Sequence, residues 1–122
     1  MTDFQTVGQQ FIQHYYQTMT ANRAGLSALY SDQSLMTYEG EQFMGVEQIM
    51  GKLNQLPNLA IDSASAVFDF QPSVNEGIFV LVNSSLSIEG GNPMRFTQTF
   101  LLQKGGASGY YVANEVFRLS LG

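Results

Sequence analysis

The sequence contains no cysteine and one histidine, and only five of its 122 residues are Lys or Arg. Without cysteine the chain has no disulfide, thiol nucleophile or thiolate-bound metal. Zinc sites draw their ligands mainly from Cys and His, so the lone His14 argues against a metal site, and we expect no metal or other cofactor. His14 stands beside Tyr15 and Tyr16, where a structural role is more common than a catalytic one.

Basic residues are scarce relative to acidic ones, which gives a formal net charge of -5. Phosphate backbones and anionic membranes need clustered Lys and Arg, so nucleic acid and membranes are disfavoured as partners and a basic protein is favoured. The first residues lack the features of a signal peptide, and no apolar run is long enough to span a bilayer. We therefore expect a protein of the cytoplasm and nucleus.

Apolar residues at helical spacing predict three helices in the first half of the chain, over residues 3–19, 22–30 and 46–56. Thr2 and Gln5 suit a capping box at the start of the first helix, and Asn22 suits a cap for the second. Pro57 stops the third helix because proline cannot continue a helix. Between the second and third helices, residues 34–38 predict a strand.

The hydrophobic period changes to two after the third helix and predicts four strands, over residues 58–71, 77–89, 94–103 and 109–120. Turn sequences rich in Gly, or containing Pro, separate these strands. Consecutive strands joined by short turns form an antiparallel meander. The sequence therefore predicts one α+β domain over residues 1–122, with the helices packed on one face of an antiparallel sheet.

The outer face of this sheet carries more apolar residues than one wet face requires. Residues 77–82 are apolar on both alternating sets. A second copy packed on the outer face is the simplest explanation, because twofold dimers are the commonest oligomers. We predict a homodimer with Leu81 and Val116 in its interface.

Two acidic turns predict a binding site. Tyr38 precedes Glu39-Gly40-Glu41 at one turn, and Glu89 ends a later strand at another. If these turns meet at one end of the fold, they form an apolar hole with an acidic rim, which suits an aromatic side chain flanked by Lys or Arg. We expect Glu39 to act as an ion-pairing residue and not as a structural acid.

The motifs of common enzymes are missing, including the nucleophile elbow and the phosphate-binding glycine loop. The remaining enzymatic alternative is an acid–base isomerase or dehydratase that pairs a carboxylate with a tyrosine inside the fold. Its candidates are Asp62 and Asp69 with Tyr38 or Tyr111. We expect both Asp residues at exposed strand positions, and we assign no catalytic residue.

The chain resembles the nuclear transport factor 2 family over essentially its whole length. The resemblance rests on five stretches: Phe11-Ile12-Gln13-His14-Tyr15-Tyr16-Gln17, residues 35–40, Lys52-Leu53 through Leu56-Pro57, Asn92-Pro93 through Arg95-Phe96, and Phe117-Arg118-Leu119. It implies a cone-shaped fold in which three N-terminal helices pack on a strongly bent antiparallel sheet.

The resemblance also implies a function, the nuclear import of the GDP-bound form of the small GTPase Ran by a homodimer that is not an enzyme. In that family an aromatic side chain of Ran enters the cone, and basic Ran residues pair with acids on its rim. The implied rim acids are Glu39 and Glu89. The implied cavity positions are Tyr38, Leu56, Ile61, Leu86, Ile88, Met94 and Phe117.

A second implied activity is weak binding of Phe-rich (FxFG) nucleoporin repeats at the pore, with Phe4 taking part. The alternative for Phe4 is a core residue that begins the first helix. Tyr38, Asn58 and Gly91 depart from the family pattern, which implies a shallower pocket and a less negative rim. A subunit of an mRNA-export heterodimer is a further alternative, against which Glu39 and Glu89 argue.

Overall fold

The computed structural model describes residues 3–62, 64–105 and 109–120. Helix α1 (Phe4–Ala21) is followed by a 3-10 helix, η1 (Arg23–Leu29), and by strands β1 (Tyr30–Tyr38) and β2 (Glu41–Met44). Helix α2 (Gly45–Leu53) leads into β3 (Leu59–Ile61), β4 (Val67–Pro72) and a single 3-10 turn, η2 (Val74–Glu76). Three long strands complete the fold: β5 (Ile78–Ile88), β6 (Met94–Lys104) and β7 (Tyr110–Ser120).

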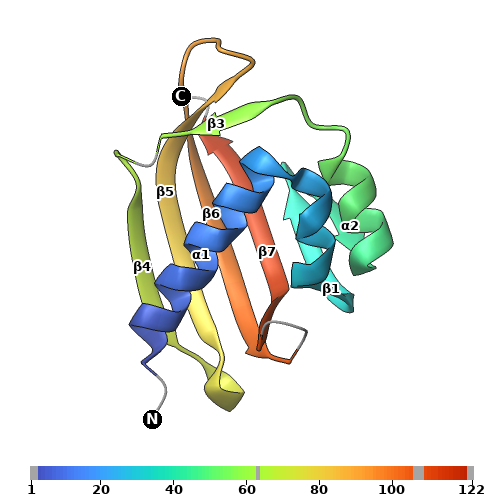
Figure 1. The fold of residues 1–122 in the computed structure, drawn as a ribbon, viewed down its shortest axis with the longest axis vertical. Coiled ribbons are helices and arrows are strands. Elements are labelled where there is room, and N and C mark those ends of the chain that lie inside the picture. Colours follow the sequence, from blue (N-terminus) through green and yellow to red (C-terminus); the bar gives the residue numbers. More distant parts are fainter. Residues whose placement is uncertain (1–2, 63, 106–108, 121–122) are drawn as a thin grey trace.

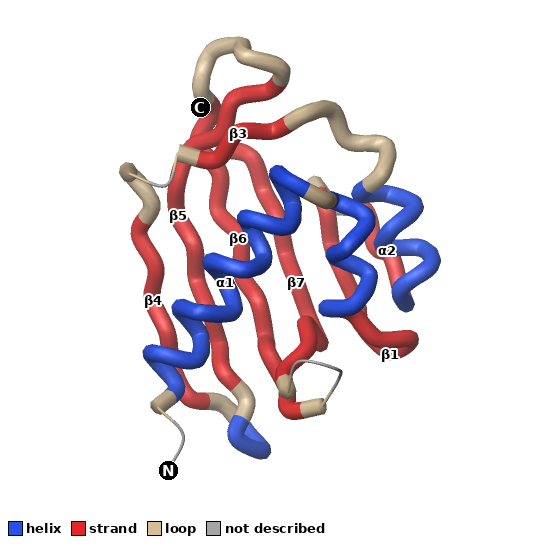
Figure 2. Tube along the Cα trace, viewed as in Figure 1, coloured by secondary structure: helices blue, strands red, loops and turns tan. Residues whose placement is uncertain are grey.

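The strands form one sheet in the order β2-β1-β7-β6-β5-β3, and β4 also pairs with β5. Helix α1 runs diagonally across one face of this sheet, and α2 lies beside β1 (Figure 1). Figure 2 shows that α1 and α2 lie on one side of the sheet. The prediction of an α+β fold with helices packed on one face of a sheet is confirmed.

One strand pair departs from the predicted antiparallel sheet. β1 pairs with β7 in parallel, with Tyr38 opposite Phe117, whereas every other described pair is antiparallel. The two paired strands stand at opposite ends of the sequence, so no tight turn fixes their direction. The sheet is therefore mixed, and this pairing brings the end of β1 beside the end of β7.

The strand predicted over residues 58–71 is interrupted. Ile61 pairs with Leu86 and Val67 with Asn83, so the chain uses six residues to advance three positions along β5. The Asp62 carboxylate accepts the Ala64 N–H at 3.2 Å, and the Ser84 hydroxyl donates to the Asp62 carbonyl at 2.8 Å. An Asp side chain that bonds the backbone in this way favours a turn over a continuous strand.

The predicted helix caps are also corrected. Asp3, and not a capping box, begins α1: its carboxylate accepts the N–H groups of Gln5 at 3.1 Å and Thr6 at 3.3 Å. Thr2 lies outside the described residues. Asn22 precedes η1 as predicted, but its side chain makes no capping hydrogen bond. A short Asp side chain ahead of the first turn satisfies the free N–H groups directly.

The core lies between the helices and the inward face of the sheet. Tyr15 and Ile12 of α1 and Leu53 of α2 are almost completely buried against inward residues of the long strands, such as Phe96 and Phe100. Gly8 allows α1 to approach β4 closely, because a Cβ at this position would lie 2.6 Å from the Phe70 ring. This packing leaves the opposite, outward face of the sheet uncovered by any described helix.

Candidate functional site

The predicted cavity residues gather at one end of the sheet, where β1, β5 and β7 end and β6 begins. Tyr38 lies opposite Phe117 on the β1–β7 pair. On the neighbouring strands, Leu86 lies between Ile61 and Met94. Residues directly opposite one another on adjacent strands project from the same face, so these side chains share the inward face. We call this end of the fold the cone mouth.

Aromatic rings form one side of the cone mouth. The rings of Tyr38 and Phe117 stack with centroids 4.6 Å apart and planes 5° apart, and Phe96 stacks on Phe117 at 5.3 Å. Phe96 and Phe117 are buried, whereas Tyr38 is partly exposed. Burial, followed by the nearby Glu39 charge, raises the pKa of Tyr38 to about 12. The hydroxyl is therefore neutral at physiological pH and presents a polar tip on an apolar ring.

Aliphatic side chains form the rest of the mouth. Leu86 is buried, while Leu56, Ile61, Ile88 and Met94 are partly buried and pack against the core. Leu56 comes from the connection between α2 and β3, and the other four come from the strands. A ring of apolar groups that stay partly exposed can accept an apolar side chain from a partner.

Both predicted rim acids stand at turns and have positive φ angles, +52° for Glu39 and +50° for Glu89, and each is followed by a glycine. The N–H of Glu39 donates to the Phe117 carbonyl at 3.0 Å, and the N–H of Glu89 donates to the Asn58 carbonyl at 2.9 Å. These bonds hold the two turns to β7 and to the start of β3. Both acidic turns therefore lie at the cone mouth.

The expectation that Glu39 has no structural role is wrong. Its carboxylate accepts the backbone N–H of Leu119 on β7. This bond satisfies a backbone donor near the end of the strand, so Glu39 helps to hold β7 as well as lending charge to the rim. Glu89 is exposed, and its carboxylate makes no described ion pair.

Lys52 lies at the cone mouth and was not predicted as a site residue from the sequence. The ammonium of Lys52 lies 5.3 Å from the Tyr38 ring centroid and 5.8 Å from that of Phe43, and 3.4 Å from the Glu41 carboxylate. Lys52 projects from the last turn of α2. A cation over an aromatic face is attracted by the ring, so Lys52 covers one side of Tyr38 and neutralises part of the acidic turn.

A buried carboxylate, Glu115, was also missed. It is 2% exposed and accepts hydrogen bonds from Tyr30 at 2.6 Å, Gln98 at 2.6 Å and Tyr15 at 3.2 Å. Burial raises the pKa of Glu115, and the three donors oppose that shift. The signal was present in the sequence: residues two apart on a strand share a face, so an inward Phe117 implies an inward Glu115.

The enzymatic alternative finds no support in these positions. Asp62 and Asp69 are both exposed, Asp69 on β4 as expected and Asp62 in the turn after β3. The hydroxyl-bearing Tyr111 alternates with inward neighbours and so faces outward. Glu115 is the deep carboxylate that such an enzyme needs, but the side chains of Tyr15, Tyr30 and Gln98 already occupy its oxygens.

The remaining predicted positions lie away from the mouth. Leu81 and Val116 both lie opposite Thr99, so they share the outward face, where Val116 is 43% exposed. Phe79, also on this face, is equally exposed. Phe4 begins α1 and is partly buried against the core. His14 is exposed on α1.

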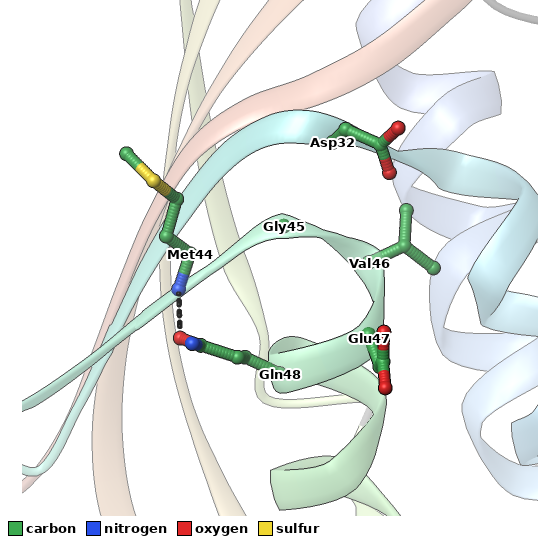
Figure 3. Close-up of a pocket in the computed structure, with 6 residues that line it drawn as sticks. All are labelled: Asp32, Met44, Gly45, Val46, Glu47 and Gln48. Carbon is green, nitrogen blue, oxygen red and sulfur yellow. Dashed lines mark hydrogen bonds between the residues drawn. The ribbon is translucent and has the colours of Figure 1, made fainter.

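Two hollows on the described surface differ in their relation to the cone mouth. The larger, of about 600 Å³, lies at the β2–α2 junction, where the Gln48 amide accepts the Met44 N–H at 2.9 Å (Figure 3). It contains none of the predicted site residues. The smaller, of about 280 Å³, includes Ile61, Leu86 and Pro93 and so borders the cone mouth.

No group of three or more metal-binding side chains occurs among residues 3–62, 64–105 and 109–120. No helix described there is both long and apolar enough to cross a membrane.

Comparison with known proteins identifies the family. The nuclear transport factor 2 (NTF2) domain model matches residues 7–119. Nuclear transport factor 2 of Emericella nidulans is 47% identical over 98% of this chain and 97% of its own length, and that of Oryza sativa is 39% identical over 98% and 99%. The solved structure of nuclear transport factor 2 from Cryptosporidium parvum is 39% identical, with a TM-score of 0.88 over 96% of this chain and 94% of that one.

A more distant structure shares the fold alone. The Mtr2-Mex67 M domain complex of C. albicans gives a TM-score of 0.85 at 17% identity. The close relatives, by contrast, are named as a nuclear transport factor and not as an enzyme, and they match along nearly their full lengths. The expectation drawn from five short stretches of sequence is confirmed: the chain belongs to the nuclear transport factor 2 family and serves nuclear transport.

Proposed function

We propose that this chain carries Ran-GDP from the cytoplasm into the nucleus by binding it at the cone mouth. The observation that supports this most directly is the stacked ring of Tyr38 at the end of β1, surrounded by partly exposed aliphatic groups and followed at once by Glu39. An aromatic side chain of a partner fits such an apolar hole, and basic neighbours of that side chain would meet the rim.

The rim is suited to basic residues, although not uniformly. Glu89 is exposed and unpaired in the described structure, so it is free to meet a cation. Glu39 keeps one oxygen on Leu119, and a carboxylate has several lone pairs with which to accept a second donor. Lys52 and Glu41 already pair, so that side of the mouth contributes little net charge.

The carrier works as a homodimer in this proposal, with the outward face of the sheet as the interface. Leu81, Val116 and Phe79 are apolar residues of that face, and the latter two are substantially exposed in the isolated chain. Burying such a patch against its own copy removes it from water and gives a twofold contact.

Passage through the nuclear pore requires weak contacts with FxFG-repeat nucleoporins, and we assign Phe4 to them. Phe4 is only partly buried at the start of α1, so part of its ring remains available. The test of the whole proposal is a pull-down with Ran loaded separately with GDP and GTP, alongside immobilised FxFG repeats. Capture of Ran-GDP but not Ran-GTP supports it, and capture of neither form rejects it.

A further inference from the structure

Arg23, the first residue of η1, is bonded to the chain segment that forms one wall of the cone mouth. Its guanidinium donates to three backbone carbonyls: Leu53 at 3.0 Å, Leu56 at 2.5 Å and Pro57 at 2.8 Å. Figure 1 shows this segment leaving the end of α2 and passing above the end of α1 toward β3. No described carboxylate lies within ion-pair distance of Arg23, so its charge serves these carbonyls.

Few other hydrogen bonds hold residues 54–58 in place. The N–H groups of Asn54, Gln55 and Leu56 continue the turn of α2: they donate to the carbonyls of Met50 at 2.9 Å, Lys52 at 3.1 Å and Leu53 at 3.1 Å. The carbonyls near a helix end have no partner within the helix, and a cation there also interacts favourably with the helix dipole. Arg23 thus supplies three bonds in a fixed fork to the helix end and to the two residues that precede Asn58.

The segment controls two parts of the proposed binding site. Leu56 contributes its side chain to the apolar wall. The carbonyl of Asn58, which follows Pro57 directly, accepts the N–H of the rim residue Glu89. Displacing residues 56–58 would therefore move both a wall residue and the turn that carries a rim acid.

The charge of Arg23 also influences the Tyr38 hydroxyl at the cone mouth. It opposes the burial and the Glu39 charge that raise the pKa of Tyr38. The three described hydrogen bonds of Arg23 all go to backbone carbonyls. Arg23 therefore acts through the backbone of the wall segment, and other residues line the opening of the cone mouth.

We infer that Arg23 is a positioning residue of the cone mouth: through its three carbonyl bonds it places Leu56 and the Glu89 turn for partner binding. This inference rests on the proposed function for its partner, Ran-GDP. In this inference Arg23 contacts no partner itself, and its removal lowers the affinity for Ran-GDP because residues 56–58 are held less firmly.

The experiment compares Arg23→Met, which keeps an apolar stem but removes all three bonds, with Arg23→Lys, which keeps the charge and can restore some of them. Lys104→Met is the matched control, because it removes one cation from an exposed pair with Glu76 at the other end of β6. Residues behind a binding site typically change affinity by roughly 2- to 30-fold. We expect Arg23→Met to lose Ran-GDP affinity in that range and Arg23→Lys to lose less. Lys104→Met should bind Ran-GDP with the affinity of the wild type.

A double-mutant cycle with Leu56→Ala separates positioning from general stability. If Arg23 acts through Leu56, the two substitutions together weaken binding by less than the product of their separate effects. Independent, multiplying effects would overturn the inference, as would a folded Arg23→Met variant that binds Ran-GDP like the wild type.

Hydrogen exchange of the Glu89 amide supplies a readout that needs no partner. Loss of the Arg23 bonds should speed the exchange of the Glu89 amide in Arg23→Met. If that variant does not fold, Arg23→Lys should show the faster exchange, and in Lys104→Met the exchange rate should equal that of the wild type. Unchanged exchange at Glu89 contradicts the inference. If the wild type does not bind Ran-GDP, the proposed function fails, while the exchange measurement still decides whether Arg23 holds the wall.

Discussion

Replacing the buried Glu115 by Ala should destabilise the fold, because it removes the acceptor of several buried hydrogen-bond donors. Three donors point at its oxygens: the hydroxyls of Tyr15 and Tyr30 and the side-chain N–H of Gln98. The two hydroxyls also lie 2.8 Å apart, so one can donate to the other after the carboxylate is removed. One hydroxyl and the Gln98 amide are then left without an acceptor.

Each buried donor left unsatisfied costs about 1–3 kcal/mol, so the two together cost about 2–6 kcal/mol. Removal of the desolvated carboxylate offsets part of this loss, because burial disfavours the charged form of Glu115. We expect a net loss of about 2–4 kcal/mol near neutral pH, a large fraction of the ~5–15 kcal/mol by which a domain is stable.

Urea denaturation of wild type, Glu115→Ala and Glu115→Gln provides the assay. Gln has nearly the same shape, so Glu115→Gln tests the charge separately from the volume. A loss below about 1 kcal/mol for Glu115→Ala, with an unchanged denaturant slope, would refute the reasoning, because it would mean that the donors find water or other acceptors.

The same residue predicts a pH dependence. The folded-state pKa of Glu115 is raised above its unfolded value, so its contribution to stability is complete below the unfolded pKa, near 4.5, and declines as pH rises through the folded pKa. Comparing wild type with Glu115→Gln isolates this slope from that of the other acids. Equal pH profiles for the two proteins would contradict the raised pKa.

Three substitutions test the separate surfaces. Val116→Glu places a charge at each side of the proposed twofold and should give monomers in sedimentation; a wild type that is already monomeric at micromolar concentration would reject the interface. Phe4→Ala should lose nucleoporin-repeat binding at a cost of ~1–3 kcal/mol and spare Ran binding, whereas early melting with loss of both activities returns Phe4 to the core. Glu39→Gln retains an acceptor for the Leu119 N–H but removes the charge that would pair with a basic residue of Ran. Calorimetry should show Ran-GDP binding weakened by about 2–5 kcal/mol if that ion pair is desolvated, and by ~0.2–1 kcal/mol if it is exposed. Unchanged affinity removes Glu39 from the site.

Local sequence patterns predicted much of the fold because they act between neighbours. The turn at Glu39-Gly40 follows from a glycine just after the strand that is able to adopt positive φ, and this glycine has a φ of +87°. The parallel pairing of β1 with β7 is not a local property, since it joins strands separated by most of the chain. At the break after Ile61 the inward apolar positions change from odd numbers, Leu59 and Ile61, to even numbers, Phe68 and Phe70. A search for a period of two does not detect such a change of phase.

The candidate site combines residues that the family resemblance implied with side chains from distant elements that no sequence pattern indicated. The resemblance implied Tyr38 and Phe117 as cavity positions, and the β1–β7 register places their rings in a stack. Lys52 reaches Tyr38 from α2, and Arg23 reaches the wall from η1. No spacing along the chain encodes such contacts between elements, so only the packed structure reveals them.

The most direct test of the proposed carrier function is a calorimetric titration of the full chain with Ran-GDP and, separately, with Ran-GTP at the same salt concentration. We predict saturable binding of Ran-GDP, with one Ran for each chain of a homodimer, and no measurable heat of binding with Ran-GTP. Equal affinity for the two nucleotide states, or binding of neither, would contradict it.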